Sequence, residues 1–256
     1  MISVYLMGGL SNCMFEISAI YSLAKENNDE FKIDYNYGLF TQQPATNYKG
    51  IVINIPDFNV NTVNFSHYNE PSFSYNQLPY TPNTMYKGYF QSEKYFIKYK
   101  DEIINMFSNQ DILTELKNKY GDRLKNSVSL HFRRGDYLHL QHFHPCPSIN
   151  YYKNSLSHIE SLKKTDNIFV FSDDINWCRN NFKDDRCIYI EGQKDYEDLY
   201  LMSLCENNVI ANSSFSWWGS YLNLNGDKIV CAPNLWFGHA FHDNWQDIYT
   251  EKMVKL

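Results

Sequence analysis

The 256-residue sequence lacks several features that mark common protein classes. Its net charge is -6, so it has no basic excess for nucleic-acid binding, although a local basic pocket for a phosphate stays open. It contains no Gly-x4-Gly-Lys-Ser/Thr motif, which argues against an ordinary P-loop nucleoside triphosphatase. Aromatic residues make up 17% of the chain, which excludes a disordered tail, and its length suffices for one large or two small packed domains.

Cysteine spacing and the N-terminus carry no targeting or metal signal. No two of the six cysteines have the spacing of a zinc knuckle or redox motif, so we expect free thiols in a reducing compartment. The opening MISVYLMGGL lacks a basic n-region, and no run of 18 apolar residues exists. These patterns predict a cytoplasmic protein without a transmembrane segment, with a peripheral contact at the inner membrane left open.

The chain begins like a nucleotide-binding unit. The apolar run 2–7 predicts a buried strand, Gly8-Gly9 a turn, and Ser11 or Asn12 the cap of a helix through Leu23. The N-terminus of that helix would direct backbone N–H groups into a cleft. Residues 30–90 are irregular. The other elements expected before residue 125 are strands at Ile51–Ile55 and Thr84–Phe90, a loop at 71–83, and helices at Ser92–Phe107 and Asp111–Tyr120.

From residue 126 onward, short apolar runs alternate with amphipathic segments. This alternation predicts a parallel sheet with helices on both faces, in a second domain that begins near residue 125. The expected strands are Ser127–Phe132, Ile168–Phe171, Cys187–Ile190, Asn208–Ala211 and Lys228–Ala232. The expected helices are Tyr151–Lys163, Ile175–Asn181, Tyr196–Cys205 and Phe215–Leu222.

The sharpest motif is His131-Phe-Arg133-Arg134-Gly135-Asp136-Tyr137, which lies at the C-terminal end of a predicted strand. Ligands of open α/β sheets bind at such ends, and guanidinium groups match phosphate through paired hydrogen bonds. The motif therefore indicates an anion site. The alternative is an Arg–Asp surface pair beside a turn.

Two further polar blocks follow strands. Asp173 and Asp174 can accept hydrogen bonds from a ribose hydroxyl or from the edge of guanine, and either can instead cap the following helix. Ser213 and Ser214 stand before a predicted helix, an arrangement that cradles phosphate. The adjacent Trp217-Trp218 pair is expected to pack on the sheet rather than to stack on a ligand.

No metal site is predicted. His139, His142 and His144 lie close together, but zinc needs three or four convergent ligands and this loop has no Cys pair. The sequence also has no Asp-x-Asp or dense carboxylate cluster for Mg²⁺. We expect the histidine loop to face substrate.

These blocks together resemble the α-1,2-fucosyltransferases of glycosyltransferase family 11. Residues Gly8 to Glu16 stand where that family has Gly-Gly-Leu-Gly-Asn-Gln-Met-Phe-Gln, and His131 to Tyr137 match its His-x-Arg-Arg-x-Asp-Tyr motif. The blocks Phe171–Asp174, Asn212–Gly219 and Ala232–Phe237 also match, in the same order. The resemblance covers nearly the whole chain.

The resemblance implies a GT-B-like fold, with two Rossmann-like halves, parallel sheets flanked by helices, and a cleft between the halves. Residues 1–125 would form the acceptor side, and residues 126–256 would bind GDP-β-L-fucose. It also implies an inverting, metal-independent transfer of L-fucose, without a cofactor, to the 2-hydroxyl of a terminal β-galactoside in an oligosaccharide or surface glycan. The residues agree, because without a metal the departing diphosphate needs the arginines and a helix N-terminus.

Several residues receive roles on this reading. Arg134, with Arg133, is expected to bind the β-phosphate and stabilise leaving GDP, and His131 to orient the pair or touch a phosphate. Asp136 is a candidate base, with an Arg-positioning role equally open. The donor-binding residues are expected to be Gly9, Asn12, Asp173, Asp174, Ser213, Ser214 and Phe215.

Three departures from the family pattern keep other functions open. Ser11 replaces a Gly, and Cys13 and Glu16 replace two Gln, near the expected cleft. A non-catalytic glycan-binding protein on the same scaffold and a related transferase with a different nucleotide sugar are therefore the alternatives. Phosphoryl transfer would need a nucleophilic Cys motif, a P-loop or a metal set, which the sequence lacks. Acceptor choice is expected to depend on residues 30–90 and on the histidine loop.

Overall fold

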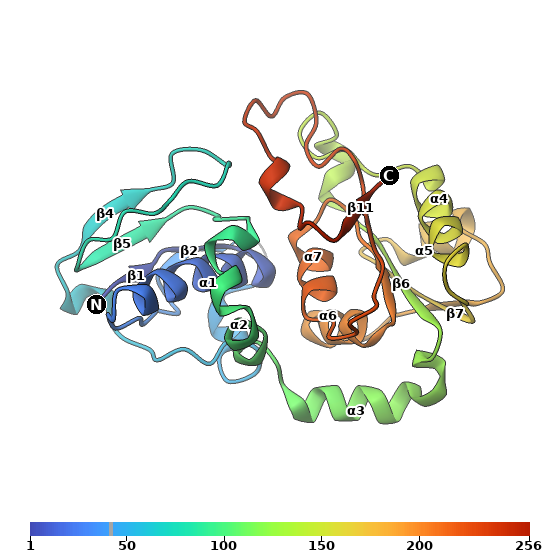
Figure 1. Ribbon diagram of the computed structural model, residues 1–256, viewed down its shortest axis with the longest axis horizontal. Helices are drawn as coiled ribbons and strands as arrows, with labels where there is room; N and C mark the ends of the chain where they lie inside the picture. Colours follow the sequence, from blue (N-terminus) through green and yellow to red (C-terminus); the bar gives the residue numbers. More distant parts are fainter. Residues whose placement is uncertain (41–42) are drawn as a thin grey trace. The chain divides into compact units, whose positions relative to one another are not determined.

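The structure is a computed structural model that describes residues 1–40 and 43–256, and the chain folds into two compact units (Figure 1). Unit 1 comprises Met1–Asn109 and Asp243–Thr250, and unit 2 comprises Gln110–His242 and Glu251–Leu256.

The division falls between Asn109 and Gln110, whereas the sequence placed it near residue 125. Helix α3 (Gln110–Tyr120) packs against helix α6 (Asp195–Leu204), so it belongs to unit 2.

Unit 1 is built on two small parallel sheets. The apolar opening of the chain supplies strand β1 (Ser3–Val4) and strand β2 (Leu6–Gly8). Strand β1 pairs with β5 (Thr84–Lys87), which pairs with β4 (Ser66–Asn69), and β2 pairs with β3 (Gly38–Phe40). Sequence patterning missed β3 and β4, which are short and largely polar or exposed. The 3-10 turns of this unit are η1 (Ala45–Tyr48), η2 (Val60–Thr62), η3 (Glu93–Tyr95), η4 (Ile97–Tyr99) and η7 (Gln246–Ile248).

Helix α1 (Leu10–Glu26) packs against β1 and β2 and is buried on most sides. It begins after Gly9. The backbone of Gly9 is extended, and glycine has no side chain that could cap the helix. The expectation that Ser11 or Asn12 caps the helix is therefore wrong, because both lie inside it.

Two further expectations for unit 1 are wrong. The segment Ile51–Ile55 forms no strand, because Gly50 (φ +76) turns the chain and the backbone N–H groups that follow donate to the Tyr48 carbonyl. The helix expected over Ser92–Phe107 is broken at Phe96, where the backbone leaves helical geometry, and only α2 (Lys100–Met106) is α-helical.

Unit 2 contains one six-stranded sheet in which all pairings are parallel, as the sequence predicted. In chain order the strands are β6 (Ser127–Phe132), β7 (Asn167–Ser172), β8 (Cys187–Tyr189), β9 (Asn207–Val209), β10 (Val230–Ala232) and β11 (Met253–Lys255). Across the sheet they run β11-β10-β9-β6-β7-β8. This is the strand order of dinucleotide-binding folds, and its direction of progression reverses between β6 and β9.

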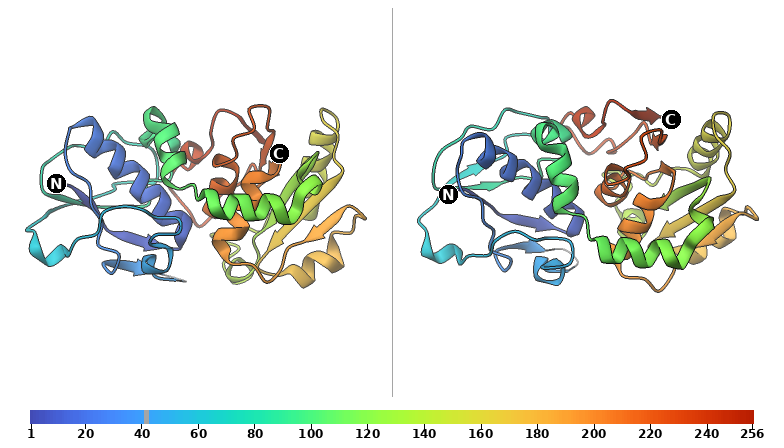
Figure 2. Two further views of the ribbon diagram at one scale, coloured as in Figure 1. Left: turned by 90° about the horizontal axis from the view of Figure 1, so that it is seen from below. Right: turned by 60° about the horizontal axis from the view of Figure 1, so that its bottom comes forward.

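Helices cover both faces of this sheet (Figure 1), and the turned views show the same layers (Figure 2). Helices α3, α6 and α7 (Ser214–Tyr221) lie on one face, and α4 (Ile149–Glu160) and α5 (Ile175–Asn181) lie on the other. The remaining helical turns of unit 2 are η5 (Gly121–Leu124) and η6 (Asp136–His139). Among the described residues, no helix has the length and apolar character needed to cross a membrane.

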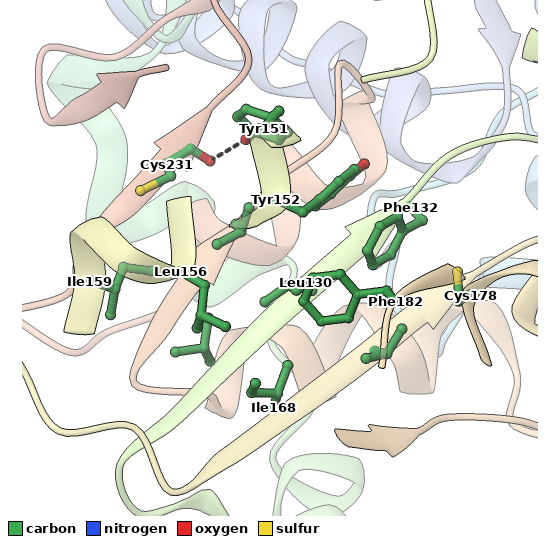
Figure 3. Close-up of a cluster of buried hydrophobic side chains, with 13 residues drawn as sticks. Leu130, Phe132, Tyr151, Tyr152, Leu156, Ile159, Ile168, Cys178, Phe182 and Cys231 are labelled. Carbon is green, nitrogen blue, oxygen red and sulfur yellow. Dashed lines mark hydrogen bonds between the residues drawn. The ribbon is translucent and has the colours of Figure 1, made fainter. Parts of the chain in front are cut away.

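Alternation along β6 fixes which residues reach each helical layer. Leu130 and Phe132 join the buried cluster under α4 and α5, which Figure 3 shows. Phe132 stacks on Tyr152 of α4 with ring centroids 3.8 Å apart. His131 points to the opposite face, where its ring lies 5.7 Å from that of Phe215 in α7. The strand is fully buried, as expected for a parallel strand covered on both sides.

Candidate functional site

The polar blocks of unit 2 meet where the strand order reverses. The double-arginine motif follows β6, and residues 212–214 follow the neighbouring strand β9. The Tyr137 hydroxyl donates a hydrogen bond to the Asn212 carbonyl over 3.1 Å, which joins the two loops directly. Crevices at such reversal points are where open α/β sheets bind ligands. The structure therefore brings the predicted site residues of unit 2 together at one edge of the sheet.

Arg133 is fully engaged by carboxylates. Its two terminal nitrogens pair with Asp136 at 2.7 Å and with Asp173 at 2.8 Å. The second oxygen of Asp173 accepts the backbone N–H of Arg134 over 2.8 Å. Asp173 thus fixes both the side chain of one arginine and the backbone of the next.

Arg134 is held differently. Its Nε donates to Asp174 over 3.3 Å, and its guanidinium carbon lies 3.5 Å from the ring centre of Trp177. Among the residues that the structure describes, no acceptor takes the terminal nitrogens of Arg134. The side chain is 15% exposed, and its contacts with Asp174 and Trp177 hold the guanidinium in one orientation, which lowers the ordering cost of binding an anion.

Asp174 also caps helix α5, because its Oδ1 accepts the backbone N–H of Trp177 over 3.2 Å. The sequence left helix cap and ligand contact open for the two acids, and the structure shows the cap. Their binding of guanine or ribose stays a prediction.

Gly135 is a site residue that the sequence reading did not single out. A Cβ built there would lie 2.7 Å from Oδ2 of Asp173, the oxygen that pairs with Arg133. Any side chain at this position must displace that ion pair. The position of Gly135 directly after the two arginines is the sequence feature that could have marked it as part of the site.

Asp136 is 57% exposed and pairs with Arg133. This contact is the one that an Arg-positioning role, left open by the sequence beside general base catalysis, would need; that role also stays a prediction. Its role as a base stays a prediction.

His131 is buried and neutral. Burial, reinforced by the positive charge of Arg133, lowers its pKa to about 3. Its Nδ1 has no hydrogen-bond partner among the described residues, while its backbone carbonyl accepts the Tyr152 hydroxyl over 2.9 Å. A neutral imidazole here fills space beneath Phe215 at the start of α7.

Helix α7 begins beside the arginines. Ser213 caps it, since its hydroxyl accepts the backbone N–H of Phe215 over 3.3 Å, and Ser214 is the first helical residue. Free N–H groups at a helix start favour anions. Trp217 and Trp218 are fully buried, which confirms that they pack inside the unit.

The predicted unit 1 residues cluster at the end of β2. Gly8 adopts a φ of +77, and Asn12 lies so close that a Cβ on Gly8 would meet its Nδ2 at 2.3 Å. Gln91, which the sequence reading missed, donates to Asn12 Oδ1 over 2.9 Å. Gly9 contributes the extended backbone before α1.

The three departures from the family pattern lie inside unit 1. Ser11 is buried within α1 and lacks a positive φ, so it does not restrict the turn. Cys13 and Glu16 are 2% and 0% exposed. Glu16 Oε2 accepts the backbone N–H of Met7 over 2.9 Å, while its Oε1 has no partner in the part of the chain that the structure describes. Burial raises its pKa well above the usual value, so the protonated acid resembles the amide of a Gln.

This burial predicts a measurable effect of Glu16→Gln. The folded state retains a proton that the unfolded state releases above about pH 4.5, so wild-type stability falls as pH rises, by up to about 1.4 kcal/mol per pH unit. The variant lacks this component, and its stability relative to wild type should increase from pH 5.5 to pH 7.5 in urea unfolding. The exposed Glu115→Gln serves as the control. Equal pH dependence in wild type and Glu16→Gln would contradict the assignment.

The histidine loop is partly packed. His144 stacks on Tyr137 with ring centroids 4.8 Å apart, and burial lowers its pKa. Within residues 1–40 and 43–256, no group of three or more His, Cys, Asp or Glu side chains is placed to hold a metal ion. All six cysteines are free thiols. Metal independence stays a prediction.

These features define the class. Unit 2 is an α/β fold of the dinucleotide-binding type, with two arginines in the loop after β6, where the strand order reverses. The whole chain, residues 1–256, matches the model of glycosyl transferase family 11. The protein belongs to this family and is a glycosyltransferase.

Relatives support this placement. An α-1,2-colitosyltransferase of Escherichia coli is 30% identical over 98% of this chain and 97% of its own length. The O-antigen biosynthesis glycosyltransferase WbnK of Escherichia coli is 38% identical over 59% of this chain, a match that spans 54% of WbnK. Galactoside α-(1,2)-fucosyltransferase 2 of Oryctolagus cuniculus is 25% identical over 88% of this chain and 68% of its own length.

The fold has solved counterparts. The fucosyltransferase NodZ from Bradyrhizobium aligns with a TM-score of 0.57, covering 86% of this chain and 91% of NodZ at 13% identity. At that identity the likeness concerns the fold. The expected GT-B-like architecture, two Rossmann-like halves with parallel sheets flanked by helices, is confirmed.

Proposed function

We propose that this family 11 glycosyltransferase moves L-fucose from GDP-β-L-fucose to the 2-hydroxyl of a terminal β-galactoside, with inversion at the anomeric carbon. The acceptor would be an oligosaccharide or a surface glycan. The observation that carries the proposal is Arg134 in the loop after β6, whose Nε is held by Asp174 and whose terminal nitrogens have no acceptor among the described residues.

The proposed reaction needs a leaving group stabilised more than it needs a strong nucleophile. The acceptor hydroxyl oxygen forms a bond to the anomeric carbon as the bond from that carbon to the β-phosphate oxygen breaks. The electron pair of the broken bond leaves on GDP, where Arg134 supplies positive charge. The acceptor proton passes to a base, for which Asp136 is the candidate from the sequence.

The other site residues would bind the donor. The start of α7, with Ser213, Ser214 and Phe215, offers hydroxyl and N–H donors to the diphosphate. Asp173 contacts both arginines, and Asn12 and Gly9 are proposed as further contacts of the donor. Arg133, whose terminal nitrogens already have acceptors, would act through its charge and by ordering the loop.

The sugar of the donor has one supported alternative. One relative that matches nearly the full chain is an α-1,2-colitosyltransferase, and other relatives are α-1,2-fucosyltransferases. A donor carrying colitose is therefore the second candidate. A non-catalytic glycan-binding role loses one argument, because Ser11, Cys13 and Glu16 are buried within α1.

The test is acceptor-dependent GDP release. GDP-fucose, GDP-colitose and GDP-mannose, together with UDP-galactose, whose transfer would release UDP instead, are supplied with and without lactose or N-acetyllactosamine, in the presence and in the absence of EDTA. We expect release from GDP-fucose that requires acceptor and is insensitive to EDTA. Release from GDP-colitose alone would transfer the proposal to the second donor. Tight GDP binding without release from any donor would favour the non-catalytic role, and loss of all release on adding EDTA would contradict metal independence.

A further inference from the structure

The side-chain amide of Asn12 has a fixed direction. Gln91 Nε2 donates to Asn12 Oδ1 over 2.9 Å, so the amide oxygen faces Gln91. The Nδ2 side therefore lies along Gly8, where only a glycine leaves room for it. A flipped amide would set two N–H donors against each other. Gln91 is 8% exposed, so solvent does not replace this bond.

A strained turn carries Gln91 into place. Phe90 adopts a φ of +47, a left-handed conformation that a large side chain rarely occupies. Such conformations persist only where surrounding groups enforce them, and they concentrate at functional sites. The strain here lies one residue before the partner of Asn12.

Glu70 enforces that turn. Its Oε2 accepts the backbone N–H groups of Tyr89 over 2.7 Å and of Phe90 over 3.1 Å. Its Oε1 lies 3.2 Å from the same Phe90 nitrogen. A Cβ on Gly88 would meet the Cβ of Glu70 at 2.3 Å, so the turn is shaped around this side chain. Ionised carboxylates form stronger hydrogen bonds to N–H groups than neutral acids do.

The charge of Glu70 is sensitive to pH near neutrality. Burial raises its pKa to about 7, despite the opposing hydrogen bonds from Phe90, Tyr89 and Tyr95. The charged or titratable groups that face Glu70 are Glu16 of α1, Tyr68 of β4, Tyr95 of η3 and Asp243, which begins the C-terminal segment of unit 1. Protonation weakens its hold on the two N–H groups, and therefore loosens the turn as pH falls.

We propose that Gln91 and Glu70 are positioning residues for the transfer reaction: Gln91 sets the direction of the Asn12 amide, and Glu70 holds the turn that carries Gln91. The proposal rests on the donor-binding role proposed for Asn12. The proposal gives a function to the turn at residues 88–91, which follows β5 and belongs neither to the double-arginine motif nor to the start of α7.

The first test is a double-mutant cycle. Gln91→Glu keeps the shape but removes the N–H donor, and should lower kcat/KM for the donor by about 10- to 100-fold with little change in Tm. Asn12→Ala should cause a similar loss. The double variant should lose no more than either single variant, because both act on one group. Independent, multiplying losses would overturn the positioning role of Gln91.

The second test is the pH profile of Glu70→Gln. In wild type the donor KM should rise as pH falls from 8 to 6, whereas in the variant it should be raised and flat over this range. Glu93→Gln of η3, a partly exposed carboxylate, is the control, with the wild-type profile expected. A wild-type slope retained in Glu70→Gln would remove Glu70 from the proposal.

A readout without turnover separates this proposal from the proposed function. Exchange of the Gln91 side-chain N–H protons, followed by NMR, should be slow in wild type and fast in both Asn12→Ala and Glu70→Gln. Slow exchange in a protein that processes no donor would defeat the proposed function while supporting the positioning geometry. Fast exchange in wild type would overturn the geometry itself.

Discussion

Arg134→Ala should lower acceptor-dependent GDP release by about 10³-fold while the protein stays folded. The variant removes the N–H groups of the Arg134 guanidinium and, with them, the ion pair to Asp174. Helix α5 keeps its cap, because Asp174 still accepts the backbone N–H of Trp177. The measurement is kcat with saturating donor, together with a thermal melt.

Two companion variants sharpen this result. Arg134→Lys keeps a charge but loses the planar fork, and should recover only part of the rate. Arg179→Ala is the matched control, since Arg179 also pairs with a carboxylate (Glu191) and lies 4.6 Å from an aromatic ring centre (Tyr189), but on the exposed side of α5. Near-normal turnover by Arg134→Ala would remove Arg134 from the mechanism.

Trp217→Ala should destabilise the protein by about 3–5 kcal/mol, because it opens a cavity at a fully buried position. The Trp217 ring stacks on Tyr221 with centroids 4.6 Å apart and meets Trp218 edge-on. The change would loosen α7, whose N-terminus is part of the candidate site. Urea unfolding of the whole protein measures the loss of stability, as a lower midpoint of the unit 2 transition with an unchanged slope.

Trp217→Phe preserves an aromatic ring and should lose much less stability. A stable Trp217→Ala protein that has lost donor binding would instead indicate that this ring contacts ligand. That outcome would contradict its buried position.

The sequence predicted unit 2 well because its signals were local and strong. Apolar runs such as Ser127–Phe132 are buried on both faces, so they stand out without reference to partners. Motif residues placed at strand ends were brought together because strands β6 and β9 are neighbours. That neighbour relation itself was not readable from either strand.

The elements and residues of unit 1 that the sequence did not predict depend on local backbone geometry or on partners far away in the sequence. Strand β4 is polar and mostly exposed, and is stabilised by pairing with β5 rather than by its own pattern. The apolar spacing of 92–107 resembled one helix, but the non-helical backbone at Phe96 divides it. Gln91 and Glu70 act through contacts to residues 79 and 20 positions away, which no local pattern reports.

The pairing of both arginines with acids also limits what the site can capture. Two guanidinium groups stand against three carboxylates, those of Asp136, Asp173 and Asp174, so the region carries a formal charge of -1 before any ligand arrives. A free phosphate ion meets repulsion as well as attraction there. Only a ligand whose other parts bring contacts of their own can offset that repulsion, which favours a complete nucleotide sugar over the abundant small anions of a cell.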